Sequence, residues 1–121
     1  MKLEDAVNGM MHSRAQLRSP QGVQDPYFIS EQMQRLAQYT GAVEEHLAAL
    51  EEEIELVEHE SFIKHSETRS VNQAEKLAKD EVSALKGSIA KLKRYVNSSW
   101  QIIGVAQSRF NHIQKESGTQ V

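Results

Sequence analysis

The fold of this chain is decided between Ile29 and Val57, where the sequence reads ISEQMQRLAQYTGAVEEHLAALEEEIELV. Alternating steps of four and three residues along this stretch meet apolar side chains at eight of nine positions, and Thr40 is the exception. A repeat of 3.5 residues keeps one apolar stripe on the side of a helix that faces a partner helix. The stretch therefore predicts a long helix in a coiled coil.

A second stretch, from Val71 to Ile113, carries the same repeat in the same register, with apolar residues at eleven of thirteen positions. The positions that join the two ladders, Ser61, Lys64 and Thr68, are polar. The pattern is compatible with one continuous helix through both ladders. It is equally compatible with a reversal at residues 64–70 that forms an antiparallel helical hairpin.

The distribution of charge favours the hairpin. Residues 31–60 carry a net charge of −8 and residues 61–121 a net charge of +5, whereas residues 1–30 are neutral. A reversal near residue 65 would place acids opposite bases, with Glu51–Glu53 facing Lys76 and Lys79, and Glu44 and Glu45 facing Lys86. Such pairs fix helix orientation more than they stabilise it.

The local sequence at residues 64–73 contains signals for both the hairpin and the continuous helix. Ser70-Val71-Asn72-Gln73 matches a capping box, which favours a new helix start. Residues 64–70 contain no glycine or proline, however, and an antiparallel dimer of continuous helices would pair the same charges between chains. Both architectures therefore stay open, with the hairpin preferred.

Composition and end signals complete the expected fold. The 121 residues include no cysteine and only two prolines, Pro20 and Pro26, which makes a strand-rich or disulfide-bonded fold improbable. Asp25-Pro26 is a helix start signal. We predict an all-α fold: a short helix and loop over residues 1–24, a long helical coiled-coil region over 25–116, and a disordered tail over 117–121.

The two apolar ladders also predict self-association, because a two-helix hairpin buries little surface on its own. We expect a homo-oligomer, a dimer or larger, in which the chains form a helical bundle. Gly41, Gly87 and Gly104 lie inside the predicted helices, either as a tolerated cost or as points of close helix approach. The residues predicted to form the core and oligomer seam are Met33, Leu36, Val43, Leu47, Leu50, Ile54, Val57, Val82, Leu85, Ile89, Leu92, Val96, Ile103 and Phe110.

No pattern in the sequence predicts catalysis. The Glu-x-x-His pattern of carboxylate-bridged metal sites is absent, and Glu55 with His59 has no matching second pair. Ser98 and Ser99 have no ordered base nearby in sequence, and no phosphate-binding glycine loop occurs. We therefore predict no enzymatic activity, no metal and no cofactor.

Two charged segments are candidate partner surfaces, although each is also explained as a solvated helix face. The first is a basic and aromatic segment that would contact nucleic acid: Lys86, Lys91, Lys93, Arg94, Tyr95 and Trp100. The second is an acidic surface that would inhibit a host protein by mimicking nucleic acid: Glu44, Glu45, Glu51, Glu52 and Glu53.

Hydropathy predicts a cytoplasmic location. No apolar run reaches the length of about 18–20 residues that spans a bilayer. Residues 1–7 carry two acids and lack the apolar core of a secretory signal. The absence of cysteine is compatible with a reducing compartment. No membrane partner is expected.

Residues 91–103 read KLKRYVNSSWQII, and Gln107-Ser108-Arg109-Phe110 and Glu116 follow them. This segment resembles the C-terminal helix of small coiled-coil proteins encoded by tailed bacteriophages, although Ala106 precedes Gln107 where those proteins carry leucine. The resemblance implies a phage-encoded accessory protein that acts in the host cytoplasm. Together with the ladders, it predicts a non-enzymatic accessory or scaffolding protein that works through protein–protein interaction.

Overall fold

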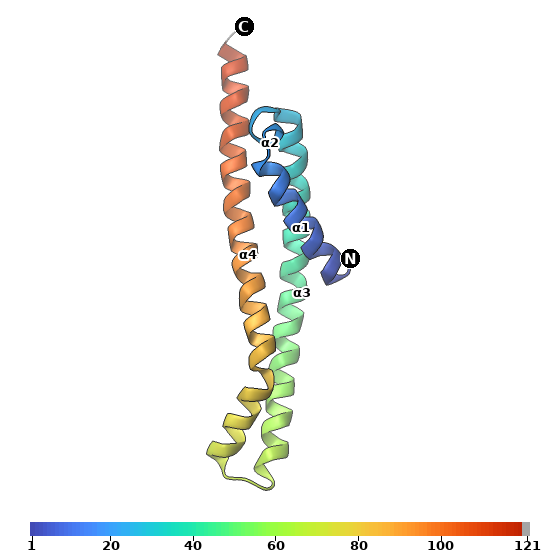
Figure 1. Cartoon of the computed structure of the whole chain (residues 1–121), viewed down its shortest axis with the longest axis vertical. Helices are drawn as coiled ribbons and strands as arrows, with labels where there is room; N and C mark the ends of the chain where they lie inside the picture. Colours follow the sequence, from blue (N-terminus) through green and yellow to red (C-terminus); the bar gives the residue numbers. More distant parts are fainter. Residues whose placement is uncertain (120–121) are drawn as a thin grey trace. The chain divides into compact units, whose positions relative to one another are not determined.

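A computed structural model describes residues 1–119, with side chains through Glu116. The described chain is helical throughout and contains no strand, which confirms the predicted all-α class. Its four helices, in chain order, are α1 (Leu3–Arg18), α2 (Gln21–Gln24), α3 (Pro26–Ser66) and α4 (Val71–Thr119) (Figure 1). Helix α4 thus extends three residues past the predicted end at Glu116, and residues 120–121 of the predicted tail lie outside the described residues.

The chain reverses between α3 and α4, so the hairpin prediction is confirmed and the single continuous helix is wrong. The Ser70 hydroxyl accepts a hydrogen bond from the Gln73 backbone N–H at 3.4 Å, and the Ala74 N–H donates to the Ser70 carbonyl at 2.9 Å. An N-cap of this kind satisfies backbone donors that a helix start otherwise leaves unpaired. The cap therefore defines the start of α4 without a glycine or a proline in the turn.

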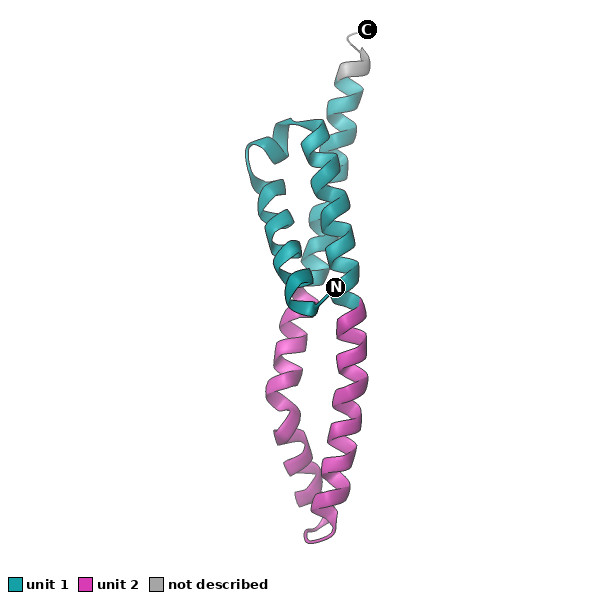
Figure 2. Ribbon diagram, turned by 90° about the vertical axis from the view of Figure 1, so that its right-hand side faces the viewer, with its two compact units in different colours: residues 1–44, 95–121 teal, residues 45–94 magenta. Residues whose placement is uncertain are grey.

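The described chain divides into two compact units, shown in different colours in Figure 2. Unit 1 contains residues 1–44 and 95–121, and unit 2 contains residues 45–94. Unit 1 consists of α1, α2, the first part of α3 and the last part of α4, whereas unit 2 is a helical hairpin. The division predicted from the sequence, into residues 1–24, 25–116 and 117–121, followed the order of the elements along the chain. The two units are defined instead by which segments pack together.

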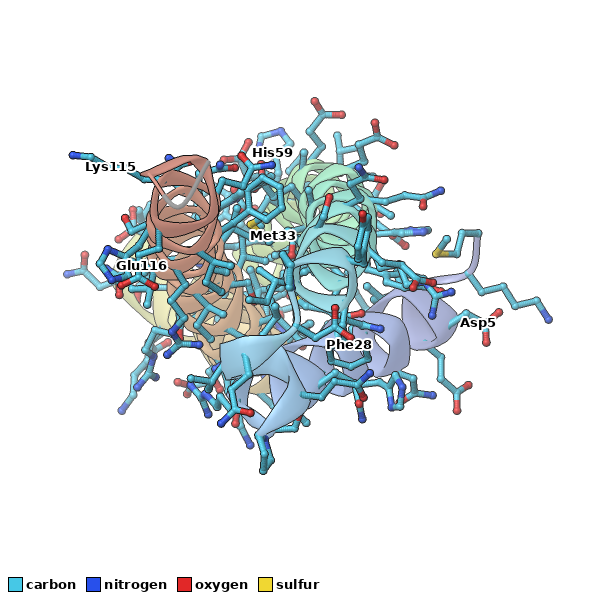
Figure 3. The ribbon with its side chains drawn as sticks, turned by 90° about the horizontal axis from the view of Figure 1, so that it is seen from above. Asp5, Phe28, Met33, His59, Lys115 and Glu116 are labelled. Carbon is cyan, nitrogen blue, oxygen red and sulfur yellow. The ribbon has the colours of Figure 1, made fainter. Side chains whose placement is uncertain are left out.

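Unit 1 is built around the start of α3. The Asp25 carboxylate accepts hydrogen bonds from the backbone N–H groups of Tyr27 at 3.0 Å and Phe28 at 3.2 Å, which confirms the predicted helix start. The segment over residues 1–24, expected to be one short helix and a loop, contains a second helix, the four-residue α2 that begins at Gln21. Met33 lies between α3 and α4 in the view of Figure 3.

We expect Asp25→Ala to lower the free energy of unfolding by about 1 kcal/mol, because two backbone donors at the start of α3 lose their acceptor. Urea unfolding followed by circular dichroism measures the effect. Asp25→Asn is the matched control, since it retains an acceptor oxygen and should stay close to wild type. An alanine variant as stable as the asparagine variant would contradict the capping role.

In heptad notation, Leu47 and Ile54 occupy position a, and Leu50 and Val57 occupy position d. The a and d rows of the two ladders are buried differently in the two units. In unit 1 both rows are covered: the predicted seam residues Met33, Leu36, Val43 and Val96 are buried, and Ile103 and Phe110 are half-buried. In unit 2 the a row is buried, at Leu47, Ile54, Val82 and Ile89.

The d row of unit 2 departs from the predicted seam. Leu50 and Leu92 are only half-buried, and Val57 and Leu85 are 42% and 54% exposed. These four residues are therefore not fully buried within the single chain, and their assignment to an oligomer seam stays a prediction. The helices of unit 2 meet mainly along the a row, with Ala74 and Ala78 also buried near the turn, and the residue after each of these four forms an ion pair across the helices.

The glycines inside the long helices do not mark close helix approach within the chain. An added Cβ at Gly41, Gly87 or Gly104 would meet nothing within 4 Å. The close approach occurs instead at Gly9 of α1, where a Cβ would lie 2.4 Å from the Tyr39 ring. A side chain at this position would have to displace the Tyr39 ring or push α1 away from α3.

Candidate interaction surfaces

One flank of the unit 2 hairpin is charged. Lys86 Nζ lies 3.0 Å from a Glu58 carboxylate oxygen, and Lys93 pairs with Glu51 in the same way. All four residues occupy position e of the heptads defined above. These pairs are partly exposed, so each contributes little to stability and mainly fixes the orientation of the helices.

The pairing confirms that acids on α3 meet bases on α4, but the predicted partners are wrong. Glu51 meets Lys93 rather than Lys76 or Lys79, and Lys86 meets Glu58 rather than Glu44 or Glu45. The predicted partners were counted from a reversal near residue 65, whereas the turn lies between Ser66 and Val71. Helical side chains also lean toward the N-terminus of their own helix, which shifts the partners further in the same direction in an antiparallel pair.

A polar cluster lies near the turn of unit 2. Ser61 Oγ donates to one Glu81 carboxylate oxygen at 2.5 Å, and His65 Nε2 lies 2.8 Å from the other. Arg69 Nη1 lies 2.9 Å from His65 Nδ1, so Nδ1 is the acceptor and Nε2 carries the proton that it donates to Glu81. No local sequence pattern predicts this cluster, because its members come from two helices and a turn.

The hydrogen bonds from His65, and then that from Ser61, hold the pKa of Glu81 below its ordinary value of 4.5. Because the folded-state pKa is the lower one, the ionised carboxylate stabilises the fold above the ordinary pKa. That contribution is lost as the pH falls through the lowered folded value.

We therefore expect Glu81→Gln to lower the urea midpoint most at neutral pH, with the difference from wild type shrinking below pH 4.5. The measurement is a series of urea titrations between neutral and acid pH. Glu60→Gln, which removes an exposed carboxylate of the same unit, serves as the control and should show a weaker pH dependence. A constant difference for Glu81→Gln at all pH values would refute the linkage.

The structure does not bring the predicted nucleic-acid residues together as free groups. Lys86 and Lys93 are paired with glutamates, whereas Lys91 and Arg94 are exposed. Tyr95 and Trp100 belong to unit 1 and the four bases to unit 2.

The aromatic groups of this candidate site have partners inside unit 1. The Arg14 guanidinium lies 5.3 Å from the centre of the Tyr95 ring, on its face. The Trp100 indole N–H donates to the Glu44 carboxylate, and 43% of Trp100 is exposed. Base stacking on Tyr95 would therefore have to displace Arg14.

The predicted acidic surface is also divided. Glu44 belongs to unit 1 and accepts the Trp100 hydrogen bond, while Glu51 is paired with Lys93. The remaining predicted members, Glu45, Glu52 and Glu53, are exposed. Three carboxylates of this candidate surface thus face solvent within unit 2.

Unit 1 contains a buried arginine that sequence reasoning missed. Arg14 of α1 donates to the Tyr95 carbonyl at 2.9 Å, to Ser98 Oγ at 3.1 Å and to Ser99 Oγ at 3.3 Å. Burial is the main cause that lowers the pKa of this guanidinium. The contacts attach α1 to α4 and occupy both serine hydroxyls that were considered as nucleophiles.

The histidine and glutamate pair considered as a metal site lines an open groove of unit 2. Glu55 and His59 border this groove together with Glu75 and Lys79. Within residues 1–119, no group of three or more histidine and acidic side chains is arranged to hold a metal ion.

The flank of unit 2 opposite its ion pairs is apolar. Leu50, Val57, Leu85 and Leu92 each directly precede a paired residue: Glu51, Glu58, Lys86 and Lys93 respectively. Consecutive helical residues are rotated by about 100°, so the four apolar side chains lie on the other side of the contact line. We call these four residues the open apolar face.

Comparison with protein-family models, curated proteins and solved structures found no match for this chain. A separate search of the described residues found no helix with the length and apolar character needed to cross a membrane.

Proposed function

We propose that this protein is a non-enzymatic, self-associating coiled-coil protein that acts by protein–protein interaction, in an accessory or scaffolding role. The supporting observation is the incomplete core of unit 2, where two helices share a narrow buried row and leave large apolar side chains outside it. Those at least 40% exposed in this unit are Leu56, Val57, Ile63, Val71 and Leu85. Exposed apolar surface of this kind marks interaction sites.

The stability of a lone hairpin supports the same proposal. An isolated two-helix unit buries too little apolar surface to offset the conformational entropy lost on folding. Association with further helices supplies the missing burial, as in four-helix bundles. The resemblance to phage-encoded coiled-coil proteins is compatible with an accessory role in the host cytoplasm.

The absolute mass in solution, measured by light scattering over a range of concentrations, tests this proposal. We expect at least twice the mass of one chain at micromolar concentration, with dissociation on dilution. A mass equal to one chain at every concentration would overturn self-association.

A further inference from the structure

We propose that the open apolar face of unit 2 is the docking surface for the hairpin of a second copy of this chain. The two hairpins point in the same direction, turn beside turn, and Glu53 of each chain lies beside Lys91 of the other. This inference rests on the proposed self-association and specifies its surface and its geometry.

The burial of the d row in unit 1 indicates that a helix would cover the open apolar face of unit 2. In unit 1 the d positions of both long helices are buried, namely Ile29, Leu36, Val43, Ser99 and Ala106. Helix α1 lies against them, because Arg14 donates to Ser99. In unit 2 the same row has no third helix within the described residues. The d row is thus a helix-docking row that in unit 2 is buried at Ala78, near the turn, but not at the open apolar face.

Charge at the borders of the face identifies the occupant as a second copy. Glu53 comes three residues after Leu50, and Lys91 directly precedes Leu92, so both lie on the outer edges of the face. Both side chains are exposed, and neither has an ion pair among the described residues. At this level one edge of the face therefore carries an acid and the other a base, which makes the patch complementary to itself there.

Glu53 and Lys91 also lie at the same level along the hairpin. Within the chain, Glu51 pairs with Lys93. Glu53 is two residues nearer the turn on α3, and Lys91 is two residues nearer the turn on α4. The same lean of the side chains therefore places them at one level. A two-fold axis along the hairpins lays α3 on the partner's α4 and forms this pair twice.

The opposite orientation is disfavoured by the same charges. With the hairpins pointing in opposite directions, the two-fold axis lays α3 on the partner's α3. The acidic edges defined by Glu53 and Glu60 then face each other, and like charges repel. Charge thus selects between two arrangements that bury the same apolar side chains.

A charge placed on the apolar face tests the surface. We expect Leu85→Asp to raise the dimer dissociation constant by about a hundredfold or more, because the carboxylate would be buried without a partner. Since Leu85 is 54% exposed within the chain, helix content should be retained. Ala48→Asp is the matched control: Ala48 is exposed on the same hairpin and directly follows the buried Leu47, on the side of α3 away from the face, so this variant should dimerise like wild type.

Charge reversal tests the pairing. Glu53→Lys and Lys91→Glu should each weaken the dimer by about three- to thirtyfold, and the double variant should regain most of the affinity. A double variant that is weaker than both single variants would overturn the proposed pair.

A label at the turn tests the direction of the hairpins. The chain has no cysteine, so Thr68→Cys provides a single spin-label site in the full-length protein. Turn-beside-turn hairpins predict a distance between labels below about 30 Å. Opposed hairpins that share the same face predict about 50 Å or more, which would overturn the orientation.

The outcomes separate this inference from the proposed function. A wild-type chain that is monomeric at every concentration overturns both. A wild-type oligomer that Leu85→Asp leaves intact overturns the docking surface alone and leaves self-association standing.

Discussion

Gly22→Ala is expected to lower the free energy of unfolding by about 2–3 kcal/mol and to loosen α1 from unit 1. A Cβ at this position would lie 2.2 Å from the Gln16 carbonyl oxygen and 2.7 Å from Leu17 Cα. These are backbone atoms at the end of α1, so no side-chain rotation relieves the collision. The end of α1 would have to separate from α2, and the buried Leu17 would lose its packing.

Urea unfolding measures the loss, and hydrogen exchange across residues 3–18 shows whether it is local to α1. Gly41→Ala is the control, and it should raise the free energy of unfolding rather than lower it. A Cβ there meets nothing within 4 Å, and alanine is better than glycine inside a helix by about 1 kcal/mol. Equal stability of the Gly22 and Gly41 variants would contradict the described packing of α1 against α2.

Arg14→Ala is expected to cost about 3 kcal/mol, because a charged donor with three hydrogen bonds is removed from a buried position. The Ser98 and Ser99 hydroxyls lose a donor, and the Tyr95 ring loses the guanidinium on its face. Exchange protection of residues 3–18 should fall more than protection of unit 2.

Two further substitutions serve as comparisons for the loss of stability in Arg14→Ala. Arg14→Lys keeps the charge but not the forked set of donors, so we expect an intermediate loss. Arg109→Ala removes one hydrogen bond, at 3.2 Å to the Leu17 carbonyl, and should cost about 1 kcal/mol. If Arg14→Ala cost no more than Arg109→Ala, the three-bond anchor of α1 would be refuted.

The ends of the long helices could be predicted because their signals are local. Asp25 and Ser70 cap helices through bonds to residues two or three positions away, and such bonds form wherever those few residues are. The 3.5-residue repeat is local in the same sense, since each apolar residue predicts its neighbours on the same face. A short helix within residues 1–24 was also predicted, and α1 spans Leu3–Arg18.

The choice of contact face could not be read from the same repeat. Apolar side chains at positions a and d mark the stripe, but Val57 and Leu85 of the d row stay exposed beside the ion pair of the residues that follow them. Several rotations of a helix bury nearly equal apolar area. Packing of the two actual surfaces selects among them, so the candidate docking face became visible only in three dimensions.

The sequence by itself determined that the chain is helical and where its long helices begin. These properties depend on bonds and side-chain spacings within a few residues. Only the tertiary structure decided which residues meet across the hairpin, where Arg14 anchors α1, and which apolar row stays open. Arg14 and Ser99 are 85 residues apart in the chain, and Glu51 meets Lys93 rather than Lys79. Contacts of this kind depend on the register, lean and rotation of whole helices, which no local pattern specifies.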